Sequence, residues 1–307
     1  MRILMFGRGV IATLYGRVLH AAGHDVEFYV RPGRAVEYGE VVQLDWIDGR
    51  RRPLGRRVRE SFRTSLRESF GPGDGFDLIV LSVGHHHLAE AAAFVAPRLG
   101  AASVLVFGNV WGEPLTAIAP LPAGRVVFGF PLAGGGFGED GLLWGGMLSS
   151  VIIGTADTAP SRREQEVFTA FRRAGLTVRH EKDMRGWLWL HFIADAGMFD
   201  QAVRSGSLAK MIGDRRAFRE AFLTTRELLP ILEARGVDLR RHRGALVQYR
   251  MPRVISTVIG WATVLIPIAS RSLAAHTDPH TTEARAVLQD TLREARRLGI
   301  QTPRLER

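Results

Sequence analysis

The first dozen residues contain a glycine turn of the kind that holds the diphosphate of a dinucleotide. Gly7, Gly9 and Ala12 fill the small positions of a G-x-G-x-x-G/A motif that follows an apolar run. The first glycine permits a tight bend, the second lets the backbone approach a pyrophosphate, and the third small residue lets helix and strand pack closely. A turn that merely connects two elements is the alternative. The predicted cofactor-binding residues of the turn are Gly7, Arg8, Gly9, Val10, Ile11 and Ala12.

The end of the following strand indicates which nicotinamide cofactor is bound. An NAD-specific site places an Asp or Glu at this tip, where it accepts hydrogen bonds from ribose hydroxyls. This chain has Arg31 there, whereas Glu27 lies within the strand. Arg31 and Arg34 flank a Pro-Gly turn and could clamp a 2′-phosphate with their fork-shaped donors. We therefore predict NADP(H); the alternative is that Arg31 is one more exposed arginine in an arginine-rich chain.

The elements around the turn have the order of a Rossmann domain. An apolar run at 2–6, helical spacing at 14–22 and an alternating segment at 24–30 predict a βαβ unit. The continuous apolar runs at 77–83 and 103–107 are typical of parallel strands buried on both faces. Between these two runs, an alanine-rich helix is expected at about 88–99.

The pattern changes in the middle of the chain. From about Val126, glycines punctuate short apolar segments, which predicts an antiparallel extension of the sheet. A helix at 161–173 and a strand at 176–179 complete this half.

Beyond Lys182 nearly the whole sequence is helical in pattern. Helices are expected at 183–203, 214–234, 240–273 with a break near Pro252 or Pro267, and 280–298. The predicted fold is α/β: an N-terminal Rossmann-type doubly wound sheet over residues 1–180, followed by an all-α domain over 181–307 for substrate binding and dimerisation.

Composition excludes several kinds of chemistry. The 307 residues include no Cys, so disulfides, Cys-ligated metals and thiol nucleophiles are absent. The formal charge is +10, and the densest basic stretch is Arg50–Arg67. That stretch could bind the phosphates of a nucleic acid. Because it lacks the interleaved aromatic residues of such binding sites, a solvent-exposed arginine face is favoured, and no nucleic acid partner is expected. His85–His87 are adjacent and do not face one point, so no metal site is expected.

No membrane association is expected. The N-terminal apolar run is about five residues long, too short for a signal-peptide core. A second apolar segment, Val254–Ala269, is shorter than the roughly 20 residues of a membrane span and is interpreted as a buried or dimer-forming helix. These features predict a cytoplasmic protein that forms a homodimer.

Taken in order, several segments resemble the ketopantoate reductase (2-dehydropantoate 2-reductase) family over most of the chain. Besides the glycine turn and Arg31, the likeness rests on Phe107-Gly-Asn-Val-Trp-Gly112, Val127-Phe-Gly-Phe-Pro-Leu-Ala-Gly-Gly135, Arg185-Gly-Trp-Leu-Trp189, Thr282-Glu283 and Arg296-Arg-Leu-Gly-Ile-Gln-Thr-Pro303. The resemblance implies reduction of the 2-oxo group of ketopantoate by NADPH, on the pantothenate route, in the cleft between the two domains.

The resemblance also implies roles for individual residues. Asn109, the only Asn in the chain, matches an asparagine that positions cofactor and substrate. Glu283 falls where the family has a glutamate that binds the substrate hydroxyl; alternatively it is a first-turn glutamate that complements the helix dipole. The family's general acid is a lysine, and here His191 stands at that position. Asp195 and Phe199 replace two asparagines further along the same helix.

His191 and Asp195 are four residues apart, so they project from one face of a helix. The carboxylate could pair with the imidazole, favour its charged form and let it replace the ammonium as the acid. Alternatively, His191 packs in a helix interface and Asp195 binds an arginine. Because an added carboxylate would repel an anionic 2-oxo acid, a larger neutral or cationic ketone or imine becomes the expected substrate. A non-redox biosynthetic enzyme, for cyclisation or isomerisation, and an NADPH-binding sensor remain the alternative functions.

Overall fold

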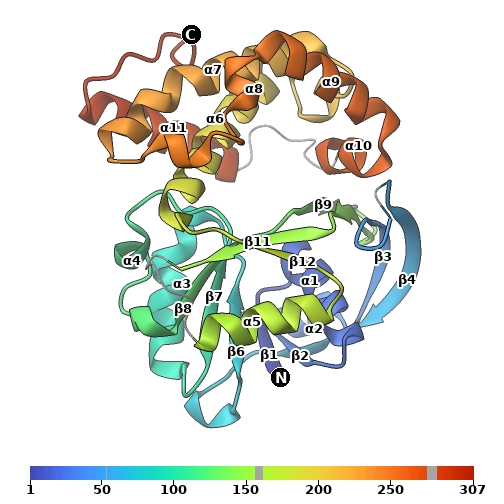
Figure 1. Cartoon of the computed structure of the whole chain (residues 1–307). Helices are drawn as coiled ribbons and strands as arrows, with labels where there is room; N and C mark the ends of the chain where they lie inside the picture. The colour runs from blue at the N-terminus through green and yellow to red at the C-terminus, as the bar shows by residue number, and fades with distance from the viewer. Residues whose placement is uncertain (53, 156–161, 275–281) are drawn as a thin grey trace. The chain divides into compact units, whose positions relative to one another are not determined.

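The computed structural model describes residues 1–52, 54–155, 162–274 and 282–307. The chain divides into two compact units (Figure 1). The first comprises Met1–Gly108 and Gly112–Met184, and the second comprises Asn109–Trp111 and Arg185–Arg307.

An eight-stranded sheet forms the centre of the first unit, with the strand order β12-β11-β8-β7-β6-β1-β2-β5. Its strands are β1 (Arg2–Phe6), β2 (Asp25–Tyr29), β5 (Ser65–Arg67), β6 (Leu78–Leu81), β7 (Ser103–Phe107), β8 (Val126–Phe130), β11 (Ser150–Gly154) and β12 (Thr177–His180). The six strands from β8 to β5 run parallel, whereas β11 is antiparallel to β8. The predicted antiparallel extension is therefore confirmed for β11.

For the glycine-rich segment before β11 that prediction is wrong. Strands β9 (Ala133–Phe137) and β10 (Leu143–Met147) join β3 (Val41–Asp48) and β4 (Arg56–Arg63) in a separate sheet of order β4-β3-β10-β9. Glycines are needed there because the strands approach closely: a Cβ on Gly135 would lie 2.5 Å from the carbonyl oxygen of Trp144. The sequence analysis also missed β3 and β4. The arginine-rich stretch forms β4, in which Arg57 and Arg59 both pair with the carboxylate of Asp45 on β3.

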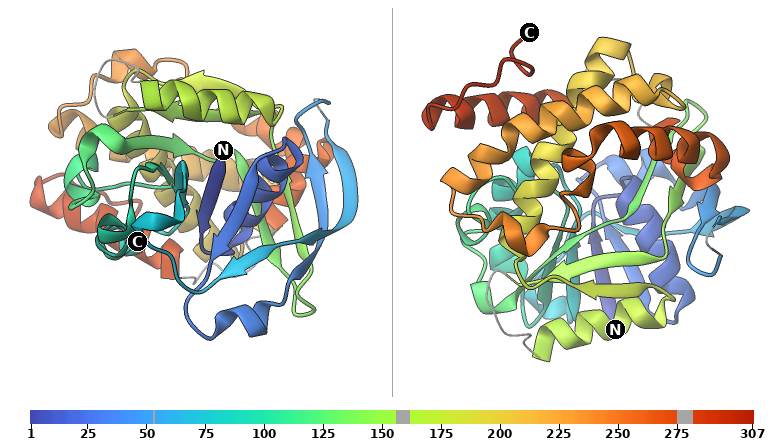
Figure 2. Two further views of the ribbon diagram at one scale, coloured as in Figure 1. Left: turned by 90° about the horizontal axis from the view of Figure 1, so that it is seen from below. Right: turned by 45° about the horizontal axis from the view of Figure 1, so that its top comes forward.

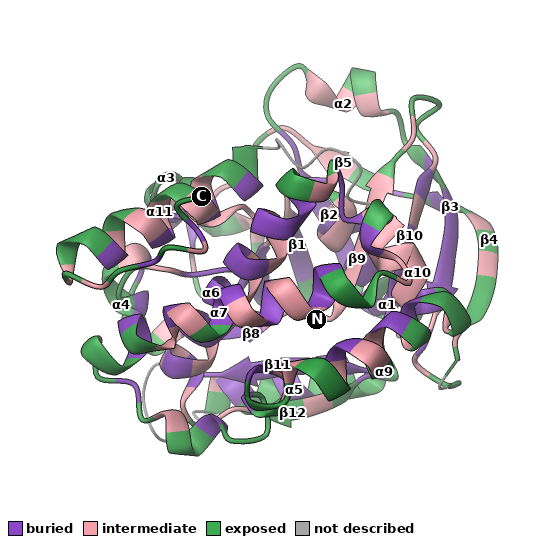
Figure 3. Ribbon diagram, turned by 90° about the horizontal axis from the view of Figure 1, so that it is seen from above, coloured by how far each residue is buried: buried purple, intermediate pink, exposed green. Residues whose placement is uncertain are grey.

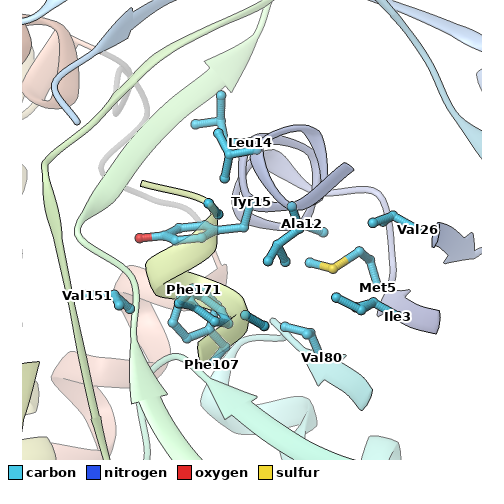
Figure 4. Close-up of a cluster of buried hydrophobic side chains, with 14 of the residues drawn as sticks. Ile3, Met5, Ala12, Leu14, Tyr15, Val26, Val80, Phe107, Val151 and Phe171 are labelled. Carbon is cyan, nitrogen blue, oxygen red and sulfur yellow. The ribbon is translucent and has the colours of Figure 1, made fainter. Parts of the chain in front are cut away.

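Helices cover both faces of the main sheet, as a doubly wound fold requires. Helices α1 (Val10–Ala21) and α5 (Arg162–Arg173) share one hydrophobic core with β1, β6 and the second sheet. Figure 4 shows this core, in which the rings of Tyr15, Phe107 and Phe171 meet. On the opposite face, Phe94 of α3 (Leu88–Val95) packs against Phe6. Short segments complete the unit: α2 (Arg34–Tyr38), α4 (Pro114–Ala117) and the 3-10 turns at Pro72–Asp74, His85–His87, Ala96–Arg98 and Ala123–Arg125.

The second unit is helical, and the right-hand view in Figure 2 shows its yellow-to-red helices. They are α6 (Met184–Ser205), α7 (Arg215–Ala234), α8 (Val247–Arg250), α9 (Pro252–Leu265), α10 (Pro267–Ala274) and α11 (Thr282–Arg297), with 3-10 turns at Ala209–Met211 and Leu239–His242. The predicted α/β fold with a helical C-terminal region is thus confirmed. The break expected near Pro252 or Pro267 in the helix at 240–273 occurs at both, because each proline begins a new helix. The α-helical part of this region begins at Val247 and not at 240.

The interpretation of Val254–Ala269 as a buried helix is wrong for most of its length. In α9 only Ser256, Gly260 and Thr263 are buried. Among the described residues no single helix is long and apolar enough to cross a membrane; α9 and α10 together would meet that test by length and composition, but they are bent by 93°.

Gly16 is the point where α1 lies closest to β2. A Cβ at this position would be 2.5 Å from the ring of Phe28, which is fully buried. Gly16→Ala should gain about 1 kcal/mol in helix propensity but lose about 1–3 kcal/mol through overpacking. We therefore expect a lower free energy of unfolding in urea. Gly124→Ala is the control, because nothing lies within 4 Å of its Cβ; equal behaviour of the two variants would contradict the packing argument.

Candidate functional site

The glycine turn between β1 and α1 has the geometry that a diphosphate requires. Gly7 has a φ of +94°, in the left-handed region that favours glycine, and its N–H donates to the carbonyl of Tyr29 over 2.9 Å. Gly9 is the N-cap of α1, yet no side chain caps this helix and its first turn contains no acidic residue. The N–H groups that open α1, at Val10, Ile11 and Ala12, therefore suit an anion.

Beside the turn lies a cavity of about 540 Å³ in the first unit. Its wall includes Gly7 and Gly9 together with three arginines, Arg8, Arg31 and Arg34. Arg31 is exposed at the end of β2, whereas the guanidinium of Arg34 forms an ion pair with Glu37 at 2.9 Å. The structure thus places the predicted phosphate-binding arginine next to the predicted diphosphate turn.

Arg8 is the most buried of these arginines, with 8% of its surface exposed. Its guanidinium lies 4.9 Å from the ring centroid of Tyr38, and Nη1 donates to the carbonyl of Tyr38 over 3.3 Å. Nε is buried without a hydrogen-bond partner among the described residues. Burial lowers the pKa of Arg8, because the charged form loses hydration. An anionic ligand in the cavity would compensate this charge, so the residues present fit a phosphorylated dinucleotide.

A second group of predicted residues meets in the helical unit. Asn109 Nδ2 donates to Asp195 Oδ2 over 2.8 Å, and His191 Nε2 lies 3.4 Å from Asp195 Oδ1. His191 and Asp195 are one turn apart on α6, and the ring of Trp187 stacks on that of His191 with a centroid distance of 5.1 Å. The structure therefore brings three of the four predicted catalytic residues together.

Asn109 is held in place by the residues that follow it. The ring of Trp111 stacks on Phe192 of α6, with the centroids 4.5 Å apart and 13° between the planes. The guanidinium of Arg235 lies 4.3 Å from the ring centroid of Trp111 and 3.5 Å from that of Trp189. Arg235 also donates to the carbonyl of Trp111 over 2.7 Å. These contacts explain why the short segment Asn109–Trp111 belongs to the helical unit.

His191 and Asp195 line a cavity of about 300 Å³ in the helical unit. Most of its wall is apolar or aromatic, and no Arg or Lys contributes to the described wall. Tyr249 of α8 is part of this wall and escaped the sequence analysis, since nothing in the sequence around it marks a site. Burial, and then the negative charge of Asp195, raise the pKa of Tyr249 above its ordinary value, so its hydroxyl stays protonated.

The remaining candidates lie elsewhere. Glu283 is exposed in the first turn of α11 and does not line this cavity. Phe199 packs against the hydrophobic core of the helical unit. His85–His87 form a 3-10 turn before α3, and His87 lines the cavity of about 540 Å³ beside Arg8. Among the described residues no group of three or more His, Asp or Glu could hold a metal ion.

Comparison with known proteins assigns the chain to a family. The family model for ketopantoate reductase PanE/ApbA matches residues 3–157, half of the chain. The chain belongs to the ketopantoate reductase family. No curated protein matches the sequence.

Solved structures of this family share its fold. The 2-dehydropantoate 2-reductase of Geobacter metallireducens is 17% identical over 100% of this chain and 97% of its own, with a TM-score of 0.67. A PanE/ApbA family ketopantoate reductase from Ralstonia eutropha is 19% identical over 100% and 95%, also with a TM-score of 0.67. D-mandelate dehydrogenase, solved with NADH and anilino(oxo)acetate, is 15% identical over 100% and 95%, with a TM-score of 0.72. At such identities the likeness shows the fold alone.

Arg235 provides a test of how Asn109 is positioned. Arg235→Met keeps an apolar side chain but removes the hydrogen bond to Trp111 and the ion pair with Glu294, whose atoms are 3.6 Å apart. We expect the free energy of unfolding to fall by about 2–4 kcal/mol, because a largely buried charged hydrogen bond and two cation–π contacts are lost. Urea unfolding followed by tryptophan fluorescence measures the change.

Arg226→Met is the matched control, since Arg226 is an exposed residue of the preceding helix α7. It should change stability by less than about 0.5 kcal/mol. Equal losses in both variants would contradict a specific role for Arg235.

Proposed function

We propose that this protein is an NADPH-dependent reductase that transfers hydride to a carbonyl or imine carbon, in the interdomain cleft that the family resemblance implies. One observation carries the proposal: the uncapped start of α1 adjoins a cavity whose wall contains three arginines. Membership of an oxidoreductase family, with a D-mandelate dehydrogenase among the structural neighbours, supports the reaction class.

The first unit would bind the cofactor through two kinds of donor. The backbone N–H groups at the start of α1 would hold the diphosphate, and the guanidinium groups of Arg31 and Arg34 would hold the 2′-phosphate. Arg8, buried under Tyr38, would contribute positive charge between them. When bound, NADPH supplies the hydride.

His191 is the proposed proton donor. Hydride addition leaves negative charge on the substrate oxygen, and one proton must reach that atom to give the alcohol. The imidazole of His191 lies at the wall of the cavity and would deliver this proton. Asp195 accepts a hydrogen bond from the side-chain amide of Asn109 and faces His191, so the two residues would orient the ring for proton donation.

The charges of the cavity favour a particular kind of substrate. Asp195 contributes a carboxylate, and the described wall has no Arg or Lys that would pair with a substrate carboxylate. An anionic 2-oxo acid such as ketopantoate would therefore be repelled by Asp195. A neutral ketone or a cationic imine with an apolar body fits the aromatic wall better.

A cofactor-binding sensor is the second candidate function. It is favoured by the replacement of the family's lysine, because Lys182 and Lys210 are the only lysines in the chain and neither lines the cavity. The two functions differ in whether bound NADPH is oxidised.

Cofactor choice can be tested by titrating NADPH fluorescence. Removing Arg31 and Arg34 together by Arg→Ala substitution should weaken NADPH binding at least about tenfold, since each charge-assisted hydrogen bond contributes about 1.5–3 kcal/mol. NADH, which lacks the 2′-phosphate, should bind the variant and the wild type alike. Arg51→Ala is the control, because Arg51 is exposed and does not line the cavity. Failure of the wild type to bind NADPH at micromolar concentration would refute the proposed function.

The role of His191 can be tested by turnover. With a panel of 4-phenyl-2-butanone, 2-phenyl-1-pyrroline and ketopantoate, we expect oxidation of NADPH by the apolar ketone or imine in preference to ketopantoate. His191→Gln should lower kcat by about 10²- to 10⁴-fold and leave the NADPH affinity unchanged. His20→Gln, at an exposed position of α1, is the control. Unchanged turnover in His191→Gln would exclude the proton-donor role, and binding without any oxidation would favour a sensor.

A further inference from the structure

Helix α9 and its N-cap residue Met251 carry several large apolar side chains on the outside. Six of them are between 51% and 69% exposed, which is unusual for apolar residues of one short helix. The exposed face of α9, in green and pink in Figure 3, contains Met251, Val254, Val258, Trp261, Val264 and Leu265.

The inner face of the same helix combines small residues with Ile255 and Ile259, which pack against the core of the helical unit. Ser256, Gly260 and Thr263 are buried, and a Cβ at Gly260 would lie 2.6 Å from Arg215 at the start of α7. Small residues therefore already allow α9 to pack closely on its own unit. Although Val264 lies beside Gly213, the described residues of the chain leave all six larger side chains more than half exposed.

The spacing of the exposed residues is that of a helix–helix seam. Met251, Val254, Val258, Trp261 and Leu265 follow one another at intervals of three and four residues, as apolar residues do at the a and d positions of paired helices. At their exposures the six side chains leave on the order of 600 Å² uncovered, larger than most apolar patches on monomers. A standard interface buries about 800 Å² per partner, so this face supplies most of the required area.

We propose that α9 pairs with α9 of a second copy of this chain around a two-fold axis at Val258, with the two helices antiparallel. This interface goes beyond the proposed catalytic function and does not depend on it. The two ends of the seam are equidistant from Val258, because Met251 and Leu265 lie seven residues to either side; Val254 and Trp261 lie four residues before it and three after it. In the antiparallel pair, Met251 therefore faces the partner's Leu265, and Val258 faces the partner's Val258.

Charge favours the antiparallel arrangement. Arg250 and Arg253 lie at one end of the seam, and no Asp or Glu occurs between Leu239 and Ala274. A parallel pair would set Arg250 against the partner's Arg250 with no carboxylate of this segment to offset the repulsion. The antiparallel pair separates these two residues by 16 positions, or about 24 Å at the rise of an α-helix.

The absence of cysteine allows a direct test, because a single introduced Cys can form a disulfide only with a second copy. A disulfide requires Cα atoms within about 7 Å. Under mild oxidation the full-length Val258→Cys variant should cross-link, since its Cys lies on the axis. Met251→Cys alone should not, since it lies about 21 Å from the partner's Cys along the helix. The double variant with Met251→Cys and Leu265→Cys should cross-link again.

Three further variants distinguish this interface from non-specific association. Val203→Cys, at an exposed apolar position of α6, should remain uncross-linked. Val258→Glu would set two carboxylates together at the axis, so light scattering should show the wild type at twice the mass of the chain and this variant at the mass of one chain. Val203→Glu should retain the wild-type mass.

Several outcomes would overturn the proposal. One is a wild-type protein that stays monomeric at all accessible concentrations; another is a Met251→Cys variant that cross-links as readily as Val258→Cys. Flotation of monomeric protein with phosphatidylglycerol vesicles, abolished by Val258→Glu, would assign the face to a lipid surface instead. Circular dichroism of each variant checks that the change reflects the interface and not unfolding.

Discussion

The guanidinium of Arg235 lies against the indole rings of both Trp111 and Trp189, and the candidate catalytic group depends on this contact. Trp111 follows Asn109 by two residues, so fixing the indole and its carbonyl also fixes the amide that binds Asp195. A buried planar cation between aromatic rings is both a packing element and a hydrogen-bond donor. The site on α6 therefore depends on a residue at the end of α7 that is itself not part of the cavity wall.

The two units differ in the charge that they present to small molecules. In the first unit, three arginines and the start of a helix create a cavity for an anion. In the second, a carboxylate, an imidazole and a protonated tyrosine face an apolar cavity with no cation in its described wall. A reductase needs both, since the cofactor is highly anionic and the reacting substrate must be desolvated.

Sequence patterns predicted the elements whose signal is local. The glycine turn, the buried parallel strands and the long helices α6 and α7 follow from spacing within one segment. The second sheet was missed for two reasons. Strand β4 looks like a charged loop until Asp45 of the neighbouring β3 is seen to bind Arg57 and Arg59, and the pairing of β3 with β10 joins segments that are distant in the sequence. The membership of Asn109–Trp111 in the helical unit could not be predicted from local patterns either. Arg235, which binds the carbonyl of Trp111, is over 120 positions away in the chain. The proximity of His191 to Asp195 followed from helical spacing, whereas Tyr249 reaches the same cavity through tertiary folding alone.

The membership of Asn109–Trp111 in the helical unit has a topological consequence. The backbone passes between the units three times, at 108/109, 111/112 and 184/185, and not once as in two domains joined in tandem. A fragment that begins at Arg185 would therefore lack Trp111 and leave the faces of Phe192 and Arg235 that this indole covers open to water. Part of the packing of the C-terminal unit is therefore encoded in the middle of the segment that forms the N-terminal unit.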